Sequence, residues 1–480
     1  MADINLGVGG ANSAVAGGYD IANSLKFEPD NSESMSRTPS SNGNLKTCTL
    51  SVWLKRTELK DGFYFSGDYG TVYPDSWFIL GFVGDRIYFS TTAGISSAGE
   101  VRPNRVFRDT SAWYHIVVAC DTTQSTAADR VKMYINGVQE TSFLVANYPN
   151  QNDDLDIMAA KAQGIGGYND GVDYFYSGYM SEFVGIDGQQ LDPTSFGEFD
   201  ADSGIWKPID VSGLTFGTNG FYLDFEDASN LGNDASGGTD FAETNITAAD
   251  QATDTPTNNF ATWQVLTGQP YAVIRNGATH YNLSGQVGWY SNVGSIAFTK
   301  GKWYAEFRLG SGITNMMAGV SQVESEQSWN NTHLGGVANS TAYTMGFYNA
   351  NGNVYTNNGS TAWGSSFPAG TIIMVAVDYK TSGVVSLYFG TNGTWANSSN
   401  PETGANNFDM NSGSPLPNNL AISFAASPYN NGGNAEANFG GFSGFSIASG
   451  NTDDNGYGTF EYAPPSGYYA LCTKNLAEYG

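Results

Sequence analysis

Aromatic side chains set among small polar residues are the part of this sequence best suited to binding a ligand. Rings flanked by Asn, Ser and Gly can stack on the C–H faces of sugars, while amides and hydroxyls satisfy the sugar hydroxyl groups. We expect ligand contact at Trp289, Trp329, Trp363 and Tyr429, with Tyr69 and Tyr73 as further candidates nearer the N-terminus. Core packing is the alternative for each ring, and we assign Trp77 and Trp395 to the core because they adjoin expected strands.

The carboxylates do not have the spacing of a known hydrolytic site. A glycoside hydrolase needs two carboxylates that flank the cleaved bond, for which E-x-D-x-x-E on one strand face is a common arrangement. Neither Glu182 with Asp187 nor Glu226 with Asp227 has that spacing. We therefore expect no catalytic residues and no enzymatic activity, with a glycanase or depolymerase that uses another arrangement as the alternative.

Histidines, cysteines and aspartates give no clear metal or nucleophile motif. His115, His280 and His333 lack partners at a known spacing, and we expect His115, on a strand, to be structural. The three cysteines, Cys48, Cys120 and Cys472, cannot all pair with one another, and we expect unpaired thiols. We expect no cofactor, but calcium remains an alternative because Asp68, Asp75, Asp121 and Asp129 offer oxygen ligands.

The charge of the chain restricts its partners. The 480 residues carry 46 Asp+Glu against 20 Lys+Arg, a formal net charge of −26. A protein this acidic is repelled by nucleic acid and by anionic membrane surfaces. Neither is therefore an expected partner.

The N-terminal residues lack the basic start and apolar core of a secretory signal, and no apolar run has the length of a membrane span. We expect a soluble protein made in a cytoplasm.

Strand and hairpin patterns occur throughout the chain, and no helical periodicity is evident. Residues 131–135 alternate apolar and polar side chains and lead into Asn136-Gly137, a tight hairpin signal. Further strands are expected at 49–55, 76–81, 86–90 and 115–120, with a hairpin at Gly84-Asp85. The phrases WYHIVVAC, KMYING and YFYSGYMSEFVGID resemble the laminin G-like, concanavalin A-like sandwich, which implies that fold for about residues 19–199.

The second half of the chain has its own series of strands. They include residues 303–307, 372–378 and 384–389, with an Asn351-Gly352 hairpin. The ordered phrases WYAEF, AGV, IIMVAVD, SLYFGTNGTW, LAISFA and ANFG resemble the SPRY (B30.2-like) sandwich. We expect an all-β protein with two antiparallel, jelly-roll type β-sandwiches joined by an acidic, extended connector.

The remaining segments have compositions unlike those of a packed core. Residues 226–262 contain no Lys or Arg, many acidic residues and two isolated phenylalanines, so we expect an extended connector. The expected domains are a flexible arm (1–18), the laminin G-like sandwich (19–199), a bridge and acidic connector (200–262), the SPRY-like sandwich (263–448) and a tail (449–480). Ile4, Leu6 and Val8 alternate within the arm, which could add as a strand to a partner's sheet or remain unused.

The combination of phrases resembles structural proteins of tailed bacteriophages. Openings such as YDIANSLKF, the middle stretch FGTNGFYLDFEDASNLGNDASG and endings such as APPSGYYALCTKNL carry this resemblance. It implies a non-enzymatic virion protein, either a tail fibre or spike or a head fibre or decoration protein, assembled in the host cytoplasm. The implied partners are other virion proteins, host-surface glycans and further copies of the chain, with a trimer expected from the gain of multivalent binding. A cellular adhesin is a further alternative.

Overall fold

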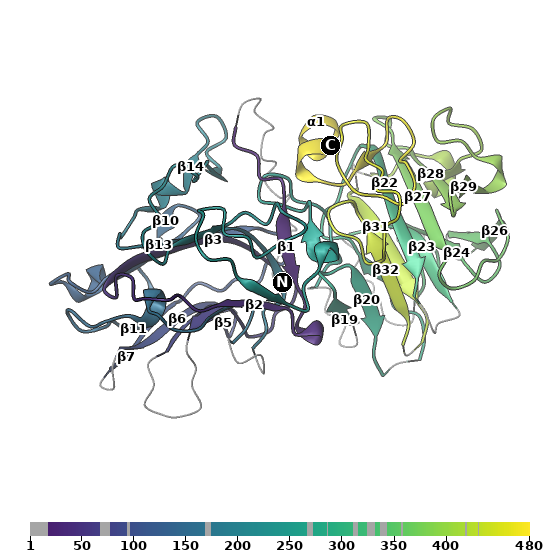
Figure 1. The fold of residues 1–480 in the computed structure, drawn as a ribbon. Coiled ribbons are helices and arrows are strands. Elements are labelled where there is room, and N and C mark those ends of the chain that lie inside the picture. Colours follow the sequence, from purple (N-terminus) through teal and green to yellow (C-terminus); the bar gives the residue numbers. More distant parts are fainter. Residues whose placement is uncertain are drawn as a thin grey trace. The chain divides into compact units, whose positions relative to one another are not determined.

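The chain forms two compact β units, which are described separately (Figure 1). The computed structural model describes residues 18–67, 77–93, 97–168, 174–265, 272–285, 287–310, 315–323, 332–336, 343–356, 359–417, 420–430 and 432–480. We call residues 18–257 the first unit and residues 258–480 the second unit. Residues 1–17 of the expected arm lie outside the described residues.

The first unit is a sandwich of two eight-stranded antiparallel sheets. Sheet I has the order β10 (Val138–Gln139), β9 (Val131–Ile135), β8 (Tyr114–Asp121), β3 (Thr47–Arg56), β13 (Gly178–Asp187), β1 (Ser24–Phe27) and β18 (Gln251–Ala252), with β16 (Phe221–Leu223) also on β13. Sheet II has the order β11 (Phe143–Asn147), β7 (Ser97–Pro103), β6 (Arg86–Ala93), β5 (Phe78–Val83), β4 (Gly62–Gly67), β12 (Gln163–Ile165), β2 (Ser34–Arg37) and β17 (Ala242–Thr244). A separate hairpin joins β14 (Gly197–Phe199) to β15 (Trp206–Pro208).

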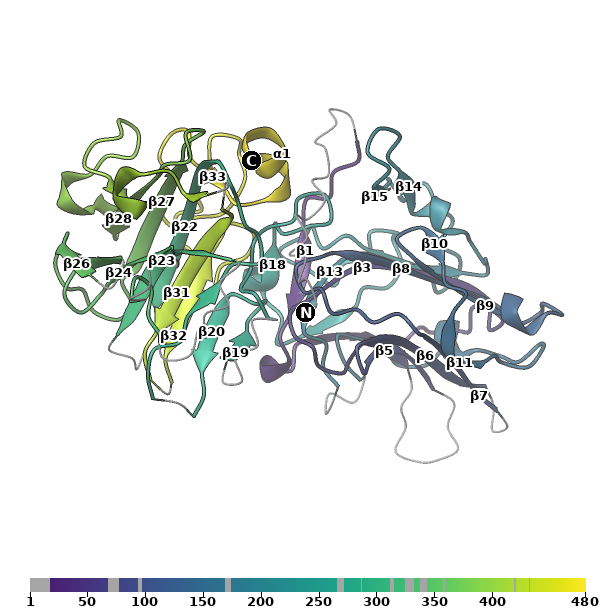
Figure 2. The same cartoon turned by 180° about the vertical axis from the view of Figure 1, so that it is seen from behind.

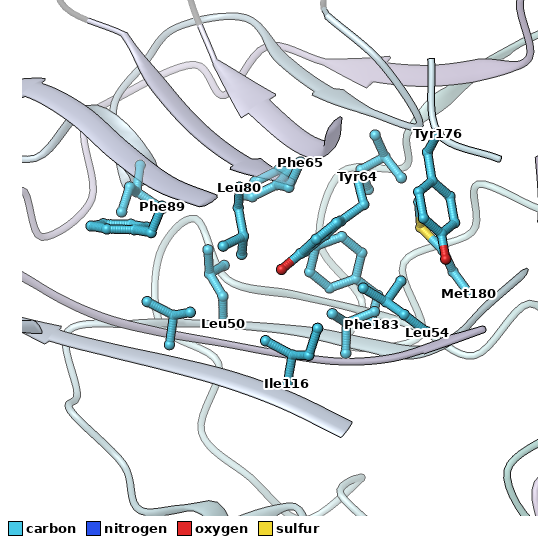
Figure 3. Close-up of a cluster of buried hydrophobic side chains, with 14 of the residues drawn as sticks. Leu50, Leu54, Tyr64, Phe65, Leu80, Phe89, Ile116, Tyr176, Met180 and Phe183 are labelled. Atoms are coloured by element: carbon cyan, nitrogen blue, oxygen red, sulfur yellow. The ribbon is translucent and has the colours of Figure 1, made fainter. Parts of the chain in front are cut away.

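Alternate side chains of the two sheets meet in one apolar core (Figure 3). Leu50 and Leu54 of β3 and Ile116 of β8 face Phe65 of β4 and Leu80 of β5. The predicted alternation of side chains over residues 131–135 is confirmed, because Val131, Met133 and Ile135 are buried in this core. The opposite face of that strand is not wet as the pattern suggests, since Tyr134 packs in a second cluster covered by residues 191–216.

The expected hairpin turns are confirmed by their backbone geometry. Gly84 and Asp85, between β5 and β6, have φ of 56° and 59°. Asn136 and Gly137, between β9 and β10, have φ of 47° and 77°. Positive φ at both central residues is the requirement that Gly, Asn and Asp meet most easily.

The expectation of an extended connector over residues 226–262 is wrong for its greater part. In this segment β17 pairs with β2 and β18 pairs with β1, so it extends both sheets of the first unit. The bridge, residues 200–225, contains β15 and β16, and β16 pairs with β13. Phe241, one of the two isolated phenylalanines, is 1% exposed in the first core, and Phe260 is buried in the second unit.

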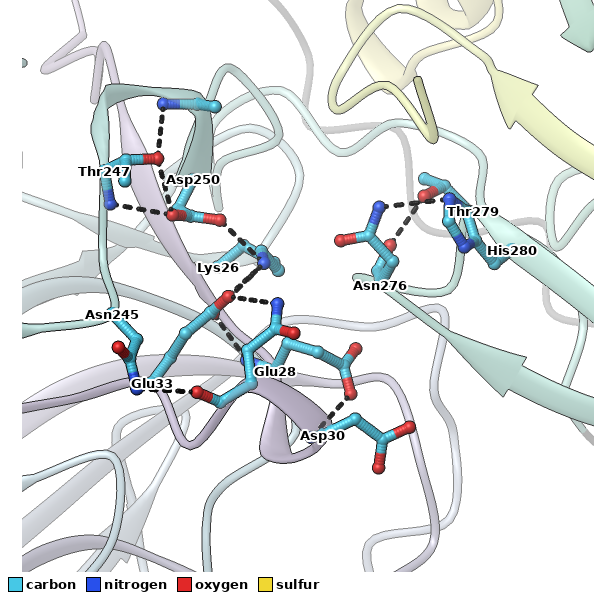
Figure 4. A network of polar contacts seen from close by, with 12 residues as sticks. Lys26, Glu28, Asp30, Glu33, Asn245, Thr247, Asp250, Asn276, Thr279 and His280 are labelled. Carbon is cyan, nitrogen blue, oxygen red and sulfur yellow. Dashed lines mark hydrogen bonds and ion pairs between the residues drawn. The ribbon is translucent and has the colours of Figure 1, made fainter. Parts of the chain in front are cut away.

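Buried ion pairs explain why this acidic segment folds. Its carboxylates form ion pairs with three cations on the first three strands. Figure 4 shows the pair between Lys26 and Asp250. Lys26 Nζ lies 2.7 Å from Asp250 Oδ1, and Lys55 Nζ lies 2.6 Å from Asp254 Oδ2. An Arg37 guanidinium nitrogen lies 3.6 Å from Asp234 Oδ2. The repulsion among the carboxylates of this segment is therefore offset by cationic partners elsewhere in the chain.

A β-bulge in β13 places a glutamate in strained backbone geometry. The register with β3 shifts between Ser181 and Val184, and Glu182 has a φ of 48°. Its Oε2 accepts hydrogen bonds from the Tyr222 hydroxyl at 2.8 Å and the Tyr19 hydroxyl at 3.1 Å. Burial raises the pKa of the Glu182 carboxyl to about 7, against the opposing effect of these two hydrogen bonds.

The second unit is a sandwich of a nine-stranded sheet and a six-stranded sheet (Figure 2). Sheet III has the order β19 (Ala272–Arg275), β20 (His280–Leu283), β32 (Asn434–Asn438), β22 (Gly301–Leu309), β27 (Ile372–Tyr379), β28 (Val385–Thr391) and β29 (Thr394–Trp395), with β30 (Phe408–Asp409) on β28 and β33 (Tyr469–Ala470) on β22. Sheet IV has the order β21 (Asn292–Val293), β31 (Ile422–Pro428), β23 (Met316–Gln322), β24 (Thr344–Tyr348), β25 (Asn353–Thr356) and β26 (Gly359–Ala362). Their inner faces enclose the second core.

The expected tail, residues 449–480, is also part of the second unit. Strand β33 runs parallel to β22, and Phe460, Tyr468 and Cys472 are buried in a cluster over sheet III. The Ala261 N–H donates to the Leu471 carbonyl at 3.0 Å, so the first and last segments of the unit lie side by side. The α-helix α1 (Thr473–Tyr479) follows.

Short 3₁₀ turns in the two units span Pro29–Asn31, Ala127–Asp129, Asp156–Met158, Pro193–Ser195, Ala248–Asp250, Ala396–Ser398 and Met410–Gly413.

Replacing Asp254 by Ala tests whether the acidic segment is needed for the first unit. The change leaves the Lys55 ammonium buried without its carboxylate, so we expect the free energy of unfolding to fall by about 3–5 kcal/mol. Urea unfolding of the full chain measures it, with the exposed Glu226→Ala as the control, expected within about 0.5 kcal/mol of the unsubstituted chain. The double variant K55M/D254A should recover much of the loss. Equal stability of D254A and E226A would contradict the role of the pair.

Replacing Glu182 by Gln tests the strained glutamate. Gln keeps an acceptor oxygen for both tyrosine hydroxyls but cannot titrate. Because the pKa in the folded protein, about 7, is above the ordinary value of 4.5, the carboxyl contributes stability below pH 4.5 that is lost as the pH rises through 7. We expect the stability of E182Q relative to the unsubstituted chain to rise by on the order of 3 kcal/mol from pH 4.5 to pH 8.

Urea unfolding at a series of pH values measures this difference. The exposed Glu198→Gln serves as the control, and its stability relative to the unsubstituted chain should not depend on pH over this range. A difference between E182Q and the unsubstituted chain that stays constant from pH 4.5 to pH 8 would show that the raised pKa is not a property of the folded state.

Candidate functional site

Five half-buried rings gather on the outer face of sheet IV and form the strongest candidate for a ligand-binding surface. We call this group the aromatic face; it consists of Trp289, His333, Tyr348, Tyr355 and Tyr429. Four of the rings close a circuit of edge-to-face contacts. The centroid distances are 5.5 Å from Trp289 to Tyr348, 5.7 Å from Tyr348 to Tyr355, 5.4 Å from Tyr355 to His333 and 5.5 Å from His333 to Trp289. Tyr429 joins the circuit through Trp289, at 4.9 Å.

The β24–β25 hairpin sets the positions of Tyr348 and Tyr355. Side chains alternate along each strand, and Phe347 and Val354 point into the core. Tyr348 and Tyr355 therefore point outward, and Tyr355 lies opposite Gly346 in the register. Trp289 and Tyr429 form an antiparallel bridge beside β21 and β31, which brings their rings to the same face.

Residues 332–336 lie across sheet IV and carry the fourth ring of the circuit. The Leu334 N–H donates to Ser427 Oγ at 3.1 Å, and the Gly335 N–H donates to Thr344 Oγ1 at 2.7 Å. A side chain at Gly346 would bring its Cβ to 2.7 Å from that of Leu334, so glycine there lets the segment approach the sheet. These contacts hold His333 between Trp289 and Tyr355.

Neutral hydrogen-bonding groups surround the rings. The Tyr348 hydroxyl donates to Asn315 Oδ1 at 2.9 Å, and Asn351 Nδ2 donates to the Tyr355 hydroxyl oxygen at 3.1 Å. His333 Nδ1 lies 3.0 Å from the Leu334 carbonyl, an arrangement that places a hydrogen on Nδ1 and leaves Nε2 as an acceptor in the neutral ring. Burial raises the pKa of Tyr348, so its phenol stays protonated at neutral pH. Rings with amide and hydroxyl groups beside them suit a ligand that has both apolar faces and many hydroxyls.

The structure brings together two of the six residues predicted to contact a ligand. Trp289 and Tyr429 are both in the aromatic face. Trp363 is not: its ring packs against Phe408 and the second core. Trp329, Tyr69 and Tyr73 lie outside the described residues. Of the two rings assigned to the core, Trp395 packs against the cluster over sheet III, as predicted, and Trp77 is partly buried.

Sequence reasoning missed His333, Tyr348 and Tyr355. The two tyrosines could have been found from the period of two in YTMGFYNANGNVY, because that pattern places them on the face opposite Phe347 and Val354. His333 had no comparable signal, since its position depends on where residues 332–336 cross the sheet.

The other residues weighed for chemistry are occupied by structural contacts. His115 is fully buried, with Nε2 2.8 Å from Ser51 Oγ, and burial lowers its pKa to about 3. Trp206 Nε1 donates to His115 Nδ1 at 3.0 Å. Asp187 accepts hydrogen bonds from the N–H groups of Asn44 and Asn219. The structural interpretation of His115 is therefore confirmed.

The cysteines and the calcium candidates can be compared with their expected roles. All three cysteines are buried and free, as expected, and Cys48 lies opposite Cys120 in the β3–β8 register. Asp121 accepts hydrogen bonds from Thr123 and Gln124, and Asp129 pairs with Lys132, while Asp68 and Asp75 fall outside the described ranges. Within those ranges, no group of three or more His, Cys, Asp or Glu residues could hold a metal ion. No helix of the described part of the chain is long and apolar enough to cross a membrane.

Comparison with known proteins supports the fold of the first unit. Residues 30–185 match the family model described as the concanavalin A-like lectin/glucanases superfamily. No curated protein matches the sequence. Similar solved structures include domains LG4-5 of the mouse laminin alpha1 chain, with 10% identity, a TM-score of 0.30, and coverage of 88% of this chain and 90% of that one.

Two further structures cover about a third of this chain. A human SPRY domain has 14% identity and a TM-score of 0.25, over 35% of this chain and 94% of that one. Domain 4 of an extracellular GH43 arabinanase from Geobacillus stearothermophilus, solved with arabinotriose, has 22% identity and a TM-score of 0.24, over 32% of this chain and 65% of that one. Similarities this distant carry no information about ligand or activity. The family match shows that residues 30–185 of the first unit are similar to the laminin G-like, concanavalin A-like lectin fold.

Proposed function

We propose that this protein is a non-enzymatic adhesin that binds glycans on the aromatic face of the second unit and is displayed on the particle of a tailed bacteriophage. The observation that carries the binding proposal is the closed circuit of four rings, with Tyr429 attached and amide groups beside it. Rings held against one another lose little conformational entropy when a ligand binds, so they are ready to stack on a sugar. The lectin-type fold of residues 30–185 supports carbohydrate as the ligand class.

The display on a virion rests on sequence resemblance. The phrases YDIANSLKF, FGTNGFYLDFEDASNLGNDASG and APPSGYYALCTKNL are similar to those of tailed-phage structural proteins. We propose other virion proteins as partners, a homotrimer as the assembled form, and either the tail or the head as its location. A trimer would present three aromatic faces, which raises the avidity of weak single-site binding. No metal or cofactor is part of this proposal.

Alanine at Trp289 and at Tyr355, singly, tests the aromatic face. We expect each change to weaken glycan binding about tenfold or more, because each removes one ring of the circuit and its stacking surface. Binding to a glycan array and titration calorimetry on the bound glycans measure the effect.

Two control variants accompany the test of the aromatic face. Trp395→Ala, on sheet III, and Trp363→Ala, whose ring faces the core, should leave the affinity unchanged. Near-ultraviolet circular dichroism checks that each variant is folded. Unchanged affinity in both W289A and Y355A would place the glycan site elsewhere, and release of reducing ends from a bound glycan would contradict the non-enzymatic role.

Deletion of residues 2–18 tests the display on a particle. The deletion keeps Tyr19, whose hydroxyl donates a hydrogen bond to Glu182. We therefore expect the unfolding of the first unit and that of the second unit to be unchanged. Purified particles made with the truncated chain should lack the protein, as measured by immunoblotting, while particles made with the full chain contain it. Normal incorporation of the truncated chain would show that another part of the protein attaches it.

A further inference from the structure

None of the cations of the second unit lies on a strand of sheet IV. Its Lys and Arg residues are Arg275, Lys300, Lys302, Arg308, Lys380 and Lys474. Arg275, Lys302 and Arg308 lie on strands of sheet III, while Lys300 precedes β22, Lys380 follows β27 and Lys474 is in α1. Residues 276–299, 309–379 and 381–473, which include every strand of sheet IV, contain no Lys or Arg.

Contacts within the unit hold several of these cations in place. Arg308 Nε pairs with Glu436 Oε2 at 2.5 Å, and Lys380 Nζ donates to Ser386 Oγ at 2.7 Å. Lys302 Nζ lies 5.2 Å from the centre of the Tyr468 ring. These partners lie on sheet III or on the segment that covers it, so the cations are held there rather than at the aromatic face.

Among the described residues, the aromatic face therefore offers a ligand no Lys or Arg side chain. Besides the five rings it presents the side-chain amides of Asn315 and Asn351, which bond to Tyr348 and Tyr355. Its one basic side chain is His333, which bonds to the Leu334 carbonyl. The only charged residues in the sequence from 309 to 377 are Glu324 and Glu326, both anionic.

We infer that the aromatic face selects uncharged saccharides and rejects acidic ones. This inference rests on the proposed function and specifies its ligand class as chains of hexoses or N-acetylhexosamines without carboxylate, sulfate or phosphate groups. An anionic sugar placed on the rings would lose hydration without gaining a lysine or arginine partner, and that loss is costly. The formal net charge of −26 adds repulsion before contact.

Matched pairs of neutral and acidic glycans test the selectivity on the full-length protein. The pairs are oligogalactose with oligogalacturonate, oligomannose with oligomannuronate, and N-acetyllactosamine with and without a terminal sialic acid. We expect the neutral member of at least one pair to bind and its acidic partner to bind at least about tenfold more weakly, with neutral binding insensitive to salt. Equal or tighter binding of the acidic members would overturn the inference but leave glycan binding intact. Binding of no member would overturn the proposed function as well.

A charge placed on sheet IV gives an independent test. Ser360 is exposed on β26 and lies opposite Tyr355 in the register, so Ser360→Lys sets an ammonium beside the aromatic face. Thr394→Lys, at the exposed Thr394 of β29 on sheet III, adds the same charge elsewhere and serves as the matched control. We expect S360K to bind the acidic members at least about threefold more tightly than T394K at low ionic strength. The same affinity in both variants would show that a missing cation is not what excludes acidic sugars.

Discussion

The first unit depends on placing anions beside the cations that its strands bury. Lys26, Arg37 and Lys55 lie on β1, β2 and β3 and are almost fully buried. An unpaired ammonium or guanidinium in such surroundings is very unfavourable, so the strands can pack only if carboxylates arrive with them. Asp250, Asp234 and Asp254 supply carboxylates to these three cations. Lys26 has a second partner outside the acidic segment, because its Nζ lies 2.8 Å from Glu33 Oε1. The Arg37 guanidinium carbon also lies 4.8 Å and 4.6 Å from the ring centres of Phe221 and Phe241. The acidic segment is thus a structural part of the sandwich.

Local patterns in the sequence predicted the strands and turns but not what covers them. Residues 131–135 with Asn136-Gly137 could be identified because alternation and positive φ are properties of a few adjacent residues. The pairing of Lys55 with Asp254 joins residues 199 positions apart, and no local pattern shows it. The lack of Lys and Arg in residues 226–262 therefore suggested self-repulsion, although the matching cations stand near the start of the unit.

The candidate site shows the same division between local and long-range information. The hairpin that directs Tyr348 and Tyr355 outward follows from alternation, whereas His333 reaches the rings only because Leu334 and Gly335 bond to distant strands. Flanking composition was a poor guide to Trp363, which stands among Ala, Gly and Ser yet turns inward onto Phe408. Whether a ring belongs to the candidate site depends on the face of the sheet that it occupies, and the composition of the neighbouring residues does not determine that face.

The pairing of Asn259 to Ala261 with residues 471–473 affects how the protein is made. The Asn259 N–H donates to the Thr473 hydroxyl, 214 positions later, and the Thr473 N–H returns a bond to the Asn259 carbonyl. The first unit has all its strands and its Asp254 carboxylate once residues up to 257 have left the ribosome, so it can fold while translation continues. The second unit must wait until residues 469–473 leave the ribosome, and until then the edge of β22 that receives β33 has no partner there. A ribosome that stalls late in the message would release a chain with a finished first sandwich and an open second one, which is prone to aggregation.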